Sequence, residues 1–155
     1  MTENASPKKK VLFLCTGNYY RSRFAEIYFN YKAINTNWGA FSRGLNLNQG
    51  NYGEISPVAV RELAKLGIPV EKQPYPQKAE IKDLENADLI ICMNKNEHKK
   101  MMEKEFPQFT ENVLYWDIAD IFEEESSSAV PKIIHNIDRL VEQLNLYSDS
   151  CLRQE

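Results

Sequence analysis

The sequence has no apolar run long enough to cross a membrane and no set of paired cysteines. A membrane-spanning helix needs roughly 20 predominantly apolar residues, and none of the apolar runs approaches that length. The three cysteines show neither CxxC nor Cys/His metal spacing, so they predict no disulfide framework and no zinc site. We therefore expect a cytoplasmic protein with no membrane partner, no metal and no cofactor.

The sequence also lacks an excess of positive charge and is poor in histidine. It holds 19 Lys and Arg against 22 Asp and Glu, a formal net charge of −3, whereas nucleic-acid-binding proteins usually carry a basic stripe. The two histidines do not suggest metal ligands, because His98 lies in a lysine-rich helix and His135 lies on the polar side of the last helix. We expect no nucleic acid among the partners.

Length and composition set the number of domains. A chain of 155 residues with 43% hydrophobic residues is the right size for one compact domain with its own core. No stretch is rich enough in glycine or proline to act as a linker between domains. We expect a single domain over residues 1–155, with flexible tails at 1–9 and 148–155, that acts as a monomer.

Short apolar runs alternate with helical patterns along the chain. The runs that predict strands are Val11–Leu14, Trp38–Ser42, Leu89–Met93 and Val113–Trp116. Ser56-Pro57 opens a helix that Gly67 closes, an apolar stripe from Ile133 to Leu144 marks the last helix, and Glu123–Ser128 is interpreted as an exposed loop. This alternation predicts an α/β fold, a doubly wound parallel sheet with helices on both faces, whose ligands bind beyond the carboxyl ends of the strands.

The first strand runs into a short loop that a helix follows at once. The loop reads Cys15-Thr16-Gly17-Asn18-Tyr19-Tyr20-Arg21-Ser22. A helix N-terminus attracts anions, successive loop amides can converge on one phosphate, and Gly17 and Asn18 suit close approach and left-handed backbone. The residues expected to bind phosphate are Thr16, Gly17, Asn18, Tyr19, Tyr20 and Arg21.

Three side chains of this loop predict nucleophilic chemistry on phosphorus. Helix N-termini and neighbouring cations favour the thiolate of a cysteine, which makes Cys15 a candidate nucleophile. Arg21 offers a planar fork of donors that can grip two phosphoryl oxygens through an in-line transition state. The Ser22 hydroxyl can bond the thiolate, and it is also a candidate N-cap of the helix.

These residues closely resemble the phosphate-binding loop of the low-molecular-weight protein tyrosine phosphatases, in which a strand of type VLFVC leads into a Cys-x5-Arg-Ser loop. The resemblance extends from Lys10 to about Leu146, through Ser42-Arg43-Gly44 and the helix after Ser56. It implies a phosphatase that hydrolyses phosphotyrosine proteins or small aryl phosphates through a cysteinyl phosphate. For the whole chain we expect three layers around four parallel strands in the order 2-1-3-4.

The resemblance also implies a general acid on a late loop, usually an Asp followed by Pro and an aromatic residue. Asp120 best matches this acid, with Phe122 in the aromatic place, and Asp117 is the alternative. Such an acid would protonate the leaving oxygen and then deprotonate the attacking water. Tyr19, Tyr52 and Phe122 are candidates for an aromatic wall around the substrate, although each of them can equally serve packing.

The sequence departs from the family pattern at several places. Tyr20 stands where many members have a second cysteine, so a protective disulfide with the nucleophile is not available. Arg23 stands where the family usually has Pro, and Ile121 replaces the Pro after the acid. Pro74 falls near the position at which many members have a histidine that supports the loop Asn. These departures predict an activity weaker than is typical.

Two other functions stay open. Arsenate reductases of similar fold use the same loop but need further thiols; Cys92 lies in an apolar strand, where a buried inert thiol is the favoured interpretation, and Cys151 lies in a polar tail. The second alternative is a weakly active pseudophosphatase that binds phosphotyrosine without turning it over.

Overall fold

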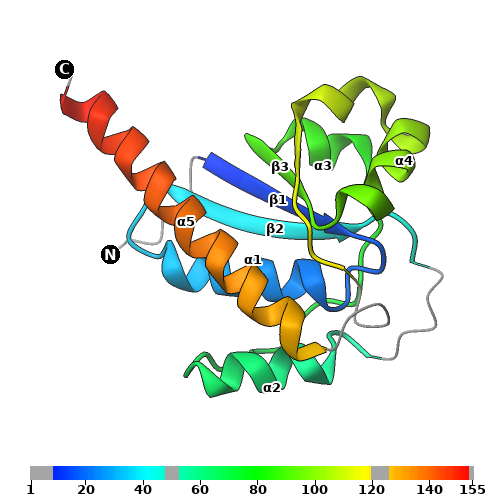
Figure 1. Ribbon diagram of the computed structural model, residues 1–155, viewed down its shortest axis with the longest axis horizontal. Coiled ribbons are helices and arrows are strands. Elements are labelled where there is room, and N and C mark those ends of the chain that lie inside the picture. Colours follow the sequence, from blue (N-terminus) through cyan, green and yellow to red (C-terminus); the bar gives the residue numbers. More distant parts are fainter. Residues whose placement is uncertain (1–8, 48–52, 120–125, 154–155) are drawn as a thin grey trace.

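The computed structural model describes residues 9–47, 53–119 and 126–153, and in the last of these segments the side chains of 129–145 (Figure 1). The elements, in chain order, are β1 (Lys9–Cys15), α1 (Arg21–Lys32), β2 (Trp38–Gly44), α2 (Pro57–Lys65), α3 (Ile81–Glu85), β3 (Leu89–Cys92), α4 (Lys95–Glu105), the 3-10 helix η1 (Pro107–Asn112), β4 (Val113–Tyr115) and α5 (Ser126–Arg153). Strands and helices alternate as the hydrophobic pattern predicts.

The four strands form one parallel sheet in the order β2-β1-β3-β4, which confirms the predicted fold. Val11 in the central strand β1 lies opposite Ala40 of β2 and Leu89 of β3. Successive side chains of a strand point to opposite faces, so Phe13 enters one core and Leu14 the other. Both faces are buried, as the nearly continuous apolar runs require.

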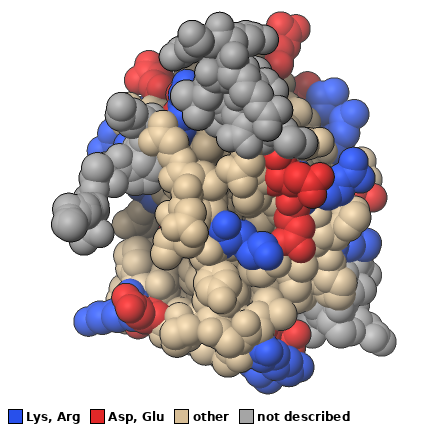
Figure 2. Space-filling view, turned by 90° about the vertical axis from the view of Figure 1, so that its left-hand side faces the viewer, with Lys and Arg blue, Asp and Glu red and all other residues tan. Residues whose placement is uncertain are grey.

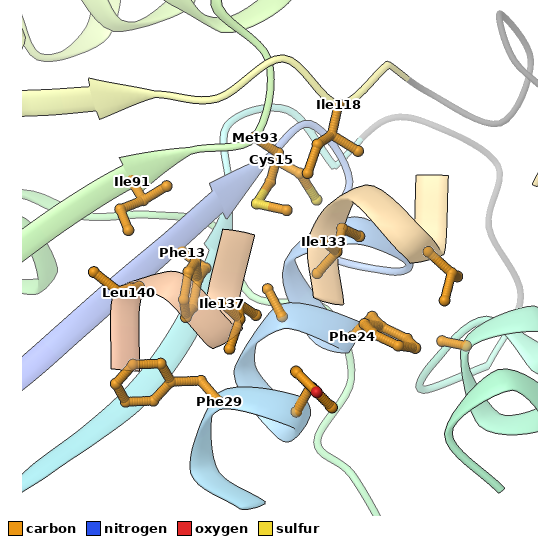
Figure 3. Close-up of a cluster of buried hydrophobic side chains, with 14 of the residues drawn as sticks. Phe13, Cys15, Phe24, Phe29, Ile91, Met93, Ile118, Ile133, Ile137 and Leu140 are labelled. Carbon is orange, nitrogen blue, oxygen red and sulfur yellow. The ribbon is translucent and has the colours of Figure 1, made fainter. Parts of the chain in front are cut away.

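Helices cover the two faces of the sheet unequally. Side chains from α1, α2 and α5 build the larger core, and side chains from α3 and α4 build the smaller one. Figure 1 shows α1 and α5 side by side on one face of the sheet, with α4 on the other. Cys15 belongs to the larger core and lies at its upper edge, beside Met93 and Ile118 (Figure 3).

Local signals in the sequence explain where several helices begin and end. Ser56 caps α2 by accepting a hydrogen bond from the Val58 N–H at 3.2 Å, and Gly67 after its end has a φ of 79°, which glycine adopts without strain. The start of α5 differs from the prediction. Ser126–Ser128 belong to this helix and not to a loop. Glu123–Glu125, the rest of the predicted loop, lie outside the described residues.

The two predicted tails are only partly described. Residues 1–8 lie outside the described residues, but Lys9 is the first residue of β1 and pairs with Trp38. At the other end, α5 continues to Arg153, through most of the segment predicted as a tail. Their flexibility stays a prediction.

The surface offers little to identify a macromolecular partner. Basic and acidic side chains are interspersed on the face in Figure 2, and neither kind forms a continuous stripe there. Among the described residues, no helix is long and apolar enough to cross a membrane, and no cluster of His, Cys, Asp and Glu could hold a metal ion. The expectations about nucleic acid, membranes and a monomeric state stay predictions.

Candidate active site

The loop between β1 and α1 is tied to its surroundings through its carbonyl groups. The carbonyl of Cys15 accepts from Leu45 N–H at 2.9 Å, that of Thr16 from Asn46 at 2.8 Å, and that of Tyr19 from Ser56 at 3.0 Å. Because the N–H of a trans peptide points away from its C=O, the amides that follow these carbonyls are directed to the opposite side. This backbone arrangement suits a nest for an anion at the start of α1.

The end of β2 approaches this loop closely because residue 44 is a glycine. A Cβ added at Gly44 would lie 2.8 Å from the Thr16 carbonyl oxygen and 3.0 Å from the Asn18 nitrogen. Contacts this short would force the loop backbone to move. Gly44 is therefore part of what shapes the loop.

Asn18 lies at the centre of the loop and is almost fully buried. Its φ of 51° is left-handed, a conformation that Asn tolerates better than most residues. Its Oδ1 accepts from the Gln77 N–H at 2.9 Å, which settles the orientation of the side-chain amide. Its Nδ2 then donates to Ser22 Oγ at 3.0 Å and to Ser42 Oγ at 2.9 Å.

The Ser22 hydroxyl lies between the Asn18 side-chain amide and the Cys15 sulfur. Ser22 Oγ lies 3.0 Å from Cys15 Sγ, in a buried setting. An amide nitrogen can only donate, so Ser22 Oγ accepts from Asn18. A Cys15 thiolate carries no hydrogen, so toward a thiolate the Ser22 hydroxyl is the donor. The N-cap of α1 is Tyr20, which shows that the interpretation of Ser22 as N-cap is wrong. The Ser22 hydroxyl is placed to stabilise a thiolate.

Arg21, at the first position of α1, is buried and is held at one edge of its guanidinium group. Nη1 donates to Glu97 Oε1 at 3.0 Å and Nη2 donates to Glu97 Oε2 at 2.8 Å. Nη1 also donates to the carbonyl of Ile118 at 3.0 Å. A bidentate carboxylate fixes a guanidinium in direction as well as in place, so Glu97 anchors the Arg21 side chain at the start of α1.

Glu97, in the first turn of α4, also contacts Thr16 and His98 in addition to Arg21. The Thr16 hydroxyl donates to Glu97 Oε2, and His98 Nε2 lies 3.2 Å from the same oxygen. His98 Nδ1 accepts from the Asn94 N–H at 3.1 Å, so Nε2 carries the ring proton of a neutral His98. Burial alone would raise the pKa of Glu97, but the hydrogen bonds from His98, Arg21 and Thr16 outweigh burial and hold this pKa well below its usual range.

Sequence reasoning missed Glu97 and the role of His98, which is fully buried and lies 3.0 Å from the Thr16 hydroxyl. One signal points to both residues. They follow β3 directly, and the carboxyl ends of neighbouring parallel strands meet at one edge of the sheet. Since β1 and β3 are neighbours, polar residues at the start of α4 are placed beside the phosphate loop. His135 is exposed, as predicted.

The segment expected to carry the general acid reaches the site but is only partly described. The Ile118 N–H donates to the Met93 carbonyl at 2.9 Å, and the Ile118 carbonyl accepts from Arg21. Asp117, before Ile118, is exposed. Asp120 and two further predicted residues, Ile121 and Phe122, lie outside the described residues, as does Tyr52.

Cys92 is fully buried and lies on the other face of the sheet from Cys15. Cys15 contributes to the larger core and Cys92 to the smaller one. Burial raises the pKa of the Cys92 thiol far above its usual range, and the nearby charge of Cys15 adds to this effect. The prediction that this thiol is buried is thus confirmed, and its lack of reactivity stays a prediction. The Cys151 side chain lies outside the described residues.

Comparisons with known proteins agree with this geometry. Residues 10–154 match the family described as low molecular weight phosphotyrosine protein phosphatase. An arsenate reductase of Brevibacillus brevis is 34% identical over 89 residues, which cover 56% of this chain and 59% of that protein. The chain therefore matches less than two thirds of the length of that relative.

Two solved structures resemble the fold over most of its length. The low molecular weight protein tyrosine phosphatase of T. tengcongensis superposes with a TM-score of 0.76 at 27% identity, over 88% of this chain and 99% of that one. The YwlE arginine phosphatase of Geobacillus stearothermophilus gives a TM-score of 0.78 at 25% identity, over 92% and 96%.

Proposed function

Because the chain belongs to the low molecular weight phosphotyrosine protein phosphatase family, we propose that it hydrolyses phosphotyrosine and other aryl phosphate esters. One observation supports this proposal most strongly. Ser22 Oγ lies 3.0 Å from the Cys15 sulfur, in the same loop that carries Arg21. A nucleophile, a donor that stabilises it and an anion-binding cation therefore lie together.

In the first step, the Cys15 thiolate attacks phosphorus in line with the leaving phenolic oxygen. The S–P bond forms as the P–O bond to the phenol breaks, and Asp120 gives its proton to that oxygen. The loop amides and Arg21 hold the equatorial oxygens, where charge accumulates in the transition state.

In the second step, a water molecule attacks the cysteinyl phosphate. Asp120, now a carboxylate, takes the proton of the water, inorganic phosphate forms, and the S–P bond breaks to return the thiolate. Ser22 acts in this step, because a sulfur that accepts a hydrogen bond is a better leaving group. The expectation for Asp120 rests on the position of Ile118, two residues before it, against Arg21.

Arsenate reduction is the second candidate, because curated relatives of this chain carry that name. Reduction of arsenate needs electrons from thiols, and a thiol that resolves the nucleophile must reach it. Cys92 lies on the opposite face of the sheet and is buried, which speaks against it in this role. A phosphatase needs no second thiol.

The decisive experiment compares the wild type with Cys15→Ser on para-nitrophenyl phosphate, a phosphotyrosine peptide and a phosphoarginine peptide. We expect hydrolysis of both aryl phosphates, none by Cys15→Ser, and a phosphorylated cysteine after acid quench. Activity retained by Cys15→Ser would refute the proposal. Exclusive hydrolysis of phosphoarginine would move the substrate to the class named for the YwlE structure. Arsenate-dependent thiol oxidation without ester hydrolysis would establish the reductase, and tight binding without a phosphocysteine would establish a pseudophosphatase.

A further inference from the structure

We propose that Arg23 is a positioning residue of the phosphate loop, which holds Asn18 in place and thereby aims the Ser22 hydroxyl at the Cys15 sulfur. Arg23 is only 2% exposed, and it is the largest of the fully buried side chains. This role rests on the proposed use of Cys15 as the nucleophile. It assigns a role to one of the positions at which the chain departs from the family pattern.

The guanidinium of Arg23 joins two segments that are far apart in the sequence. Nε donates to the Asn18 carbonyl at 3.1 Å, Nη1 donates to Gln73 Oε1 at 3.3 Å, and Nη2 donates to the Pro74 carbonyl at 2.5 Å. Burying a cation is costly unless its donors are satisfied, and here three of the five N–H groups of an arginine are. The fork therefore fastens the segment around Pro74 to the loop.

A second contact ties the same segment to the same loop residue. The Gln77 N–H donates to Asn18 Oδ1 at 2.9 Å. Asn18 thus accepts a hydrogen bond on its backbone oxygen from Arg23 and on its side-chain oxygen from Gln77. Pro74 falls near the position at which the resemblance implies a histidine that supports Asn18. In this chain the Gln77 backbone and Arg23 support Asn18 instead.

From Asn18 the connection continues to the reacting sulfur in two steps. Asn18 Nδ2 donates to Ser22 Oγ at 3.0 Å, and Ser22 Oγ lies 3.0 Å from Cys15 Sγ. The left-handed backbone of Asn18 is less favourable than a right-handed one even for Asn, and the contacts of Arg23 and Gln77 hold it in place. Without the fork of Arg23, Asn18 can relax, and the Ser22 hydroxyl loses the bond that sets its direction.

Arg23 also carries a charge, and a purely electrostatic role is the alternative. Burial lowers the pKa of Arg23, while attraction to Glu26 and to the Cys15 thiolate opposes this effect. The further charged or titratable groups that act on Arg23 or contact the loop are Arg21, Arg43, Glu54, Glu97 and His98. A lysine would keep the charge of Arg23 but has no planar fork to bind Asn18 and Pro74 together. Arg23→Lys therefore distinguishes a role in positioning Asn18 from a purely electrostatic role of the Arg23 charge.

The test measures alkylation of Cys15 by iodoacetamide at about pH 6, followed by mass spectrometry of the peptide that contains Cys15. Alkylation reports the thiolate and needs no turnover. We expect Arg23→Met and Arg23→Lys each to slow it about tenfold, the effect of losing one hydrogen bond to a charged acceptor. The matched control is Arg43→Met, which removes a guanidinium bound to Asp83 and to the Ser42 carbonyl but not to the loop.

A double-mutant cycle with Ser22→Ala distinguishes positioning from general damage. If Arg23 acts through Ser22, its substitution in a Ser22→Ala background should change the alkylation rate by less than about twofold. The same tenfold loss in both backgrounds, or a wild-type rate for Arg23→Lys, would overturn the inference. If Arg23→Met fails to fold, Arg23→Lys, which keeps the charge and most of the volume, carries the cycle.

The outcome is distinguishable from failure of the proposed function. If the variants show the expected coupling in alkylation but the wild type hydrolyses no phosphate ester, the role of Arg23 stands and the proposed phosphatase activity is refuted. If the wild type hydrolyses phosphate esters but Arg23 and Ser22 show no coupling, the phosphatase activity stands and the role of Arg23 is refuted.

Discussion

Both carboxylate oxygens of Glu97 bind the guanidinium of Arg21, at 3.0 Å from Nη1 and 2.8 Å from Nη2. The pair joins the first turn of α1 to the first turn of α4. A guanidinium is planar and has two such forks, so a carboxylate on the Nη1–Nη2 edge also fixes the direction of the Nε–Nη2 edge. We infer that Glu97 orients Arg21 for a phosphoryl group and does not compete with it.

We predict that Glu97→Gln weakens the active site without unfolding the protein. The amide can accept from only one nitrogen of Arg21, so the guanidinium loses its fixed direction, and kcat/KM should fall about 10- to 100-fold, as expected for misplaced groups. The inhibition constant of inorganic phosphate should rise in parallel. Glu103→Gln, on the exposed side of α4, is the control. Tighter inhibition by phosphate in Glu97→Gln would show that Glu97 competes for Arg21.

The lowered pKa of Glu97 predicts how stability depends on pH. A carboxyl group with a lower pKa in the folded state binds more protons when unfolded, so stability rises with pH through its titration. The contribution of Glu97 should be complete above about pH 4.3, the usual value for Glu, and it should shrink as the pH falls below that. Urea unfolding from pH 3 to pH 7 should give wild type a steeper loss in acid than Glu97→Gln. Parallel curves would contradict this.

Two glycine substitutions should separate loop geometry from overall stability. Gly44→Ala forces a Cβ to within 2.8 Å of the Thr16 carbonyl oxygen, so it should cost about 1–3 kcal/mol of unfolding free energy and also weaken phosphate binding. Gly67→Ala is strained only by its φ of 79°, far from the loop, and should cost about 1 kcal/mol with little change in KM. Thermal unfolding and steady-state kinetics measure both. An unchanged KM in Gly44→Ala would show that the loop tolerates this contact.

The sequence predicts the strands and the core of the site because these depend on local patterns. Apolar runs mark β1 to β4, and the loop from Cys15 to Ser22 lies within one strand–loop–helix unit whose spacing carries its chemistry. The Ser56 cap and the Gly67 end of α2 are equally local. The resemblance to a family predicts the strand order and a general acid on a late loop.

The partners of the loop could not be predicted in the same way. Glu97 and His98 lie more than 75 residues after Thr16, and only the parallel pairing of β1 and β3 brings them together. Arg23 stands out in the sequence as a departure, but its bonds to Gln73 and Pro74 depend on how the chain returns after α2. Such contacts are set by tertiary packing, which no short pattern encodes.

We expect Asp120, and not Asp117, to be the general acid. Ile118 binds Arg21 through its carbonyl, so the described part of this segment, which ends at Ala119, is held against the phosphate loop. Asp117 precedes this contact and is exposed, which favours Asp120. We expect Asp120→Asn to lower kcat about 10²- to 10⁴-fold, the usual worth of a general acid, and most for phenols of high pKa.

Asp117→Asn is the matched control for this test, because it removes the same charge three positions earlier. Steady-state rates on a series of aryl phosphates give the dependence on the leaving group for each variant. A steep dependence in Asp117→Asn and a wild-type slope in Asp120→Asn would transfer the role to Asp117. A wild-type slope in both variants would mean that neither protonates the leaving oxygen, and the acid would have to be sought elsewhere around the loop.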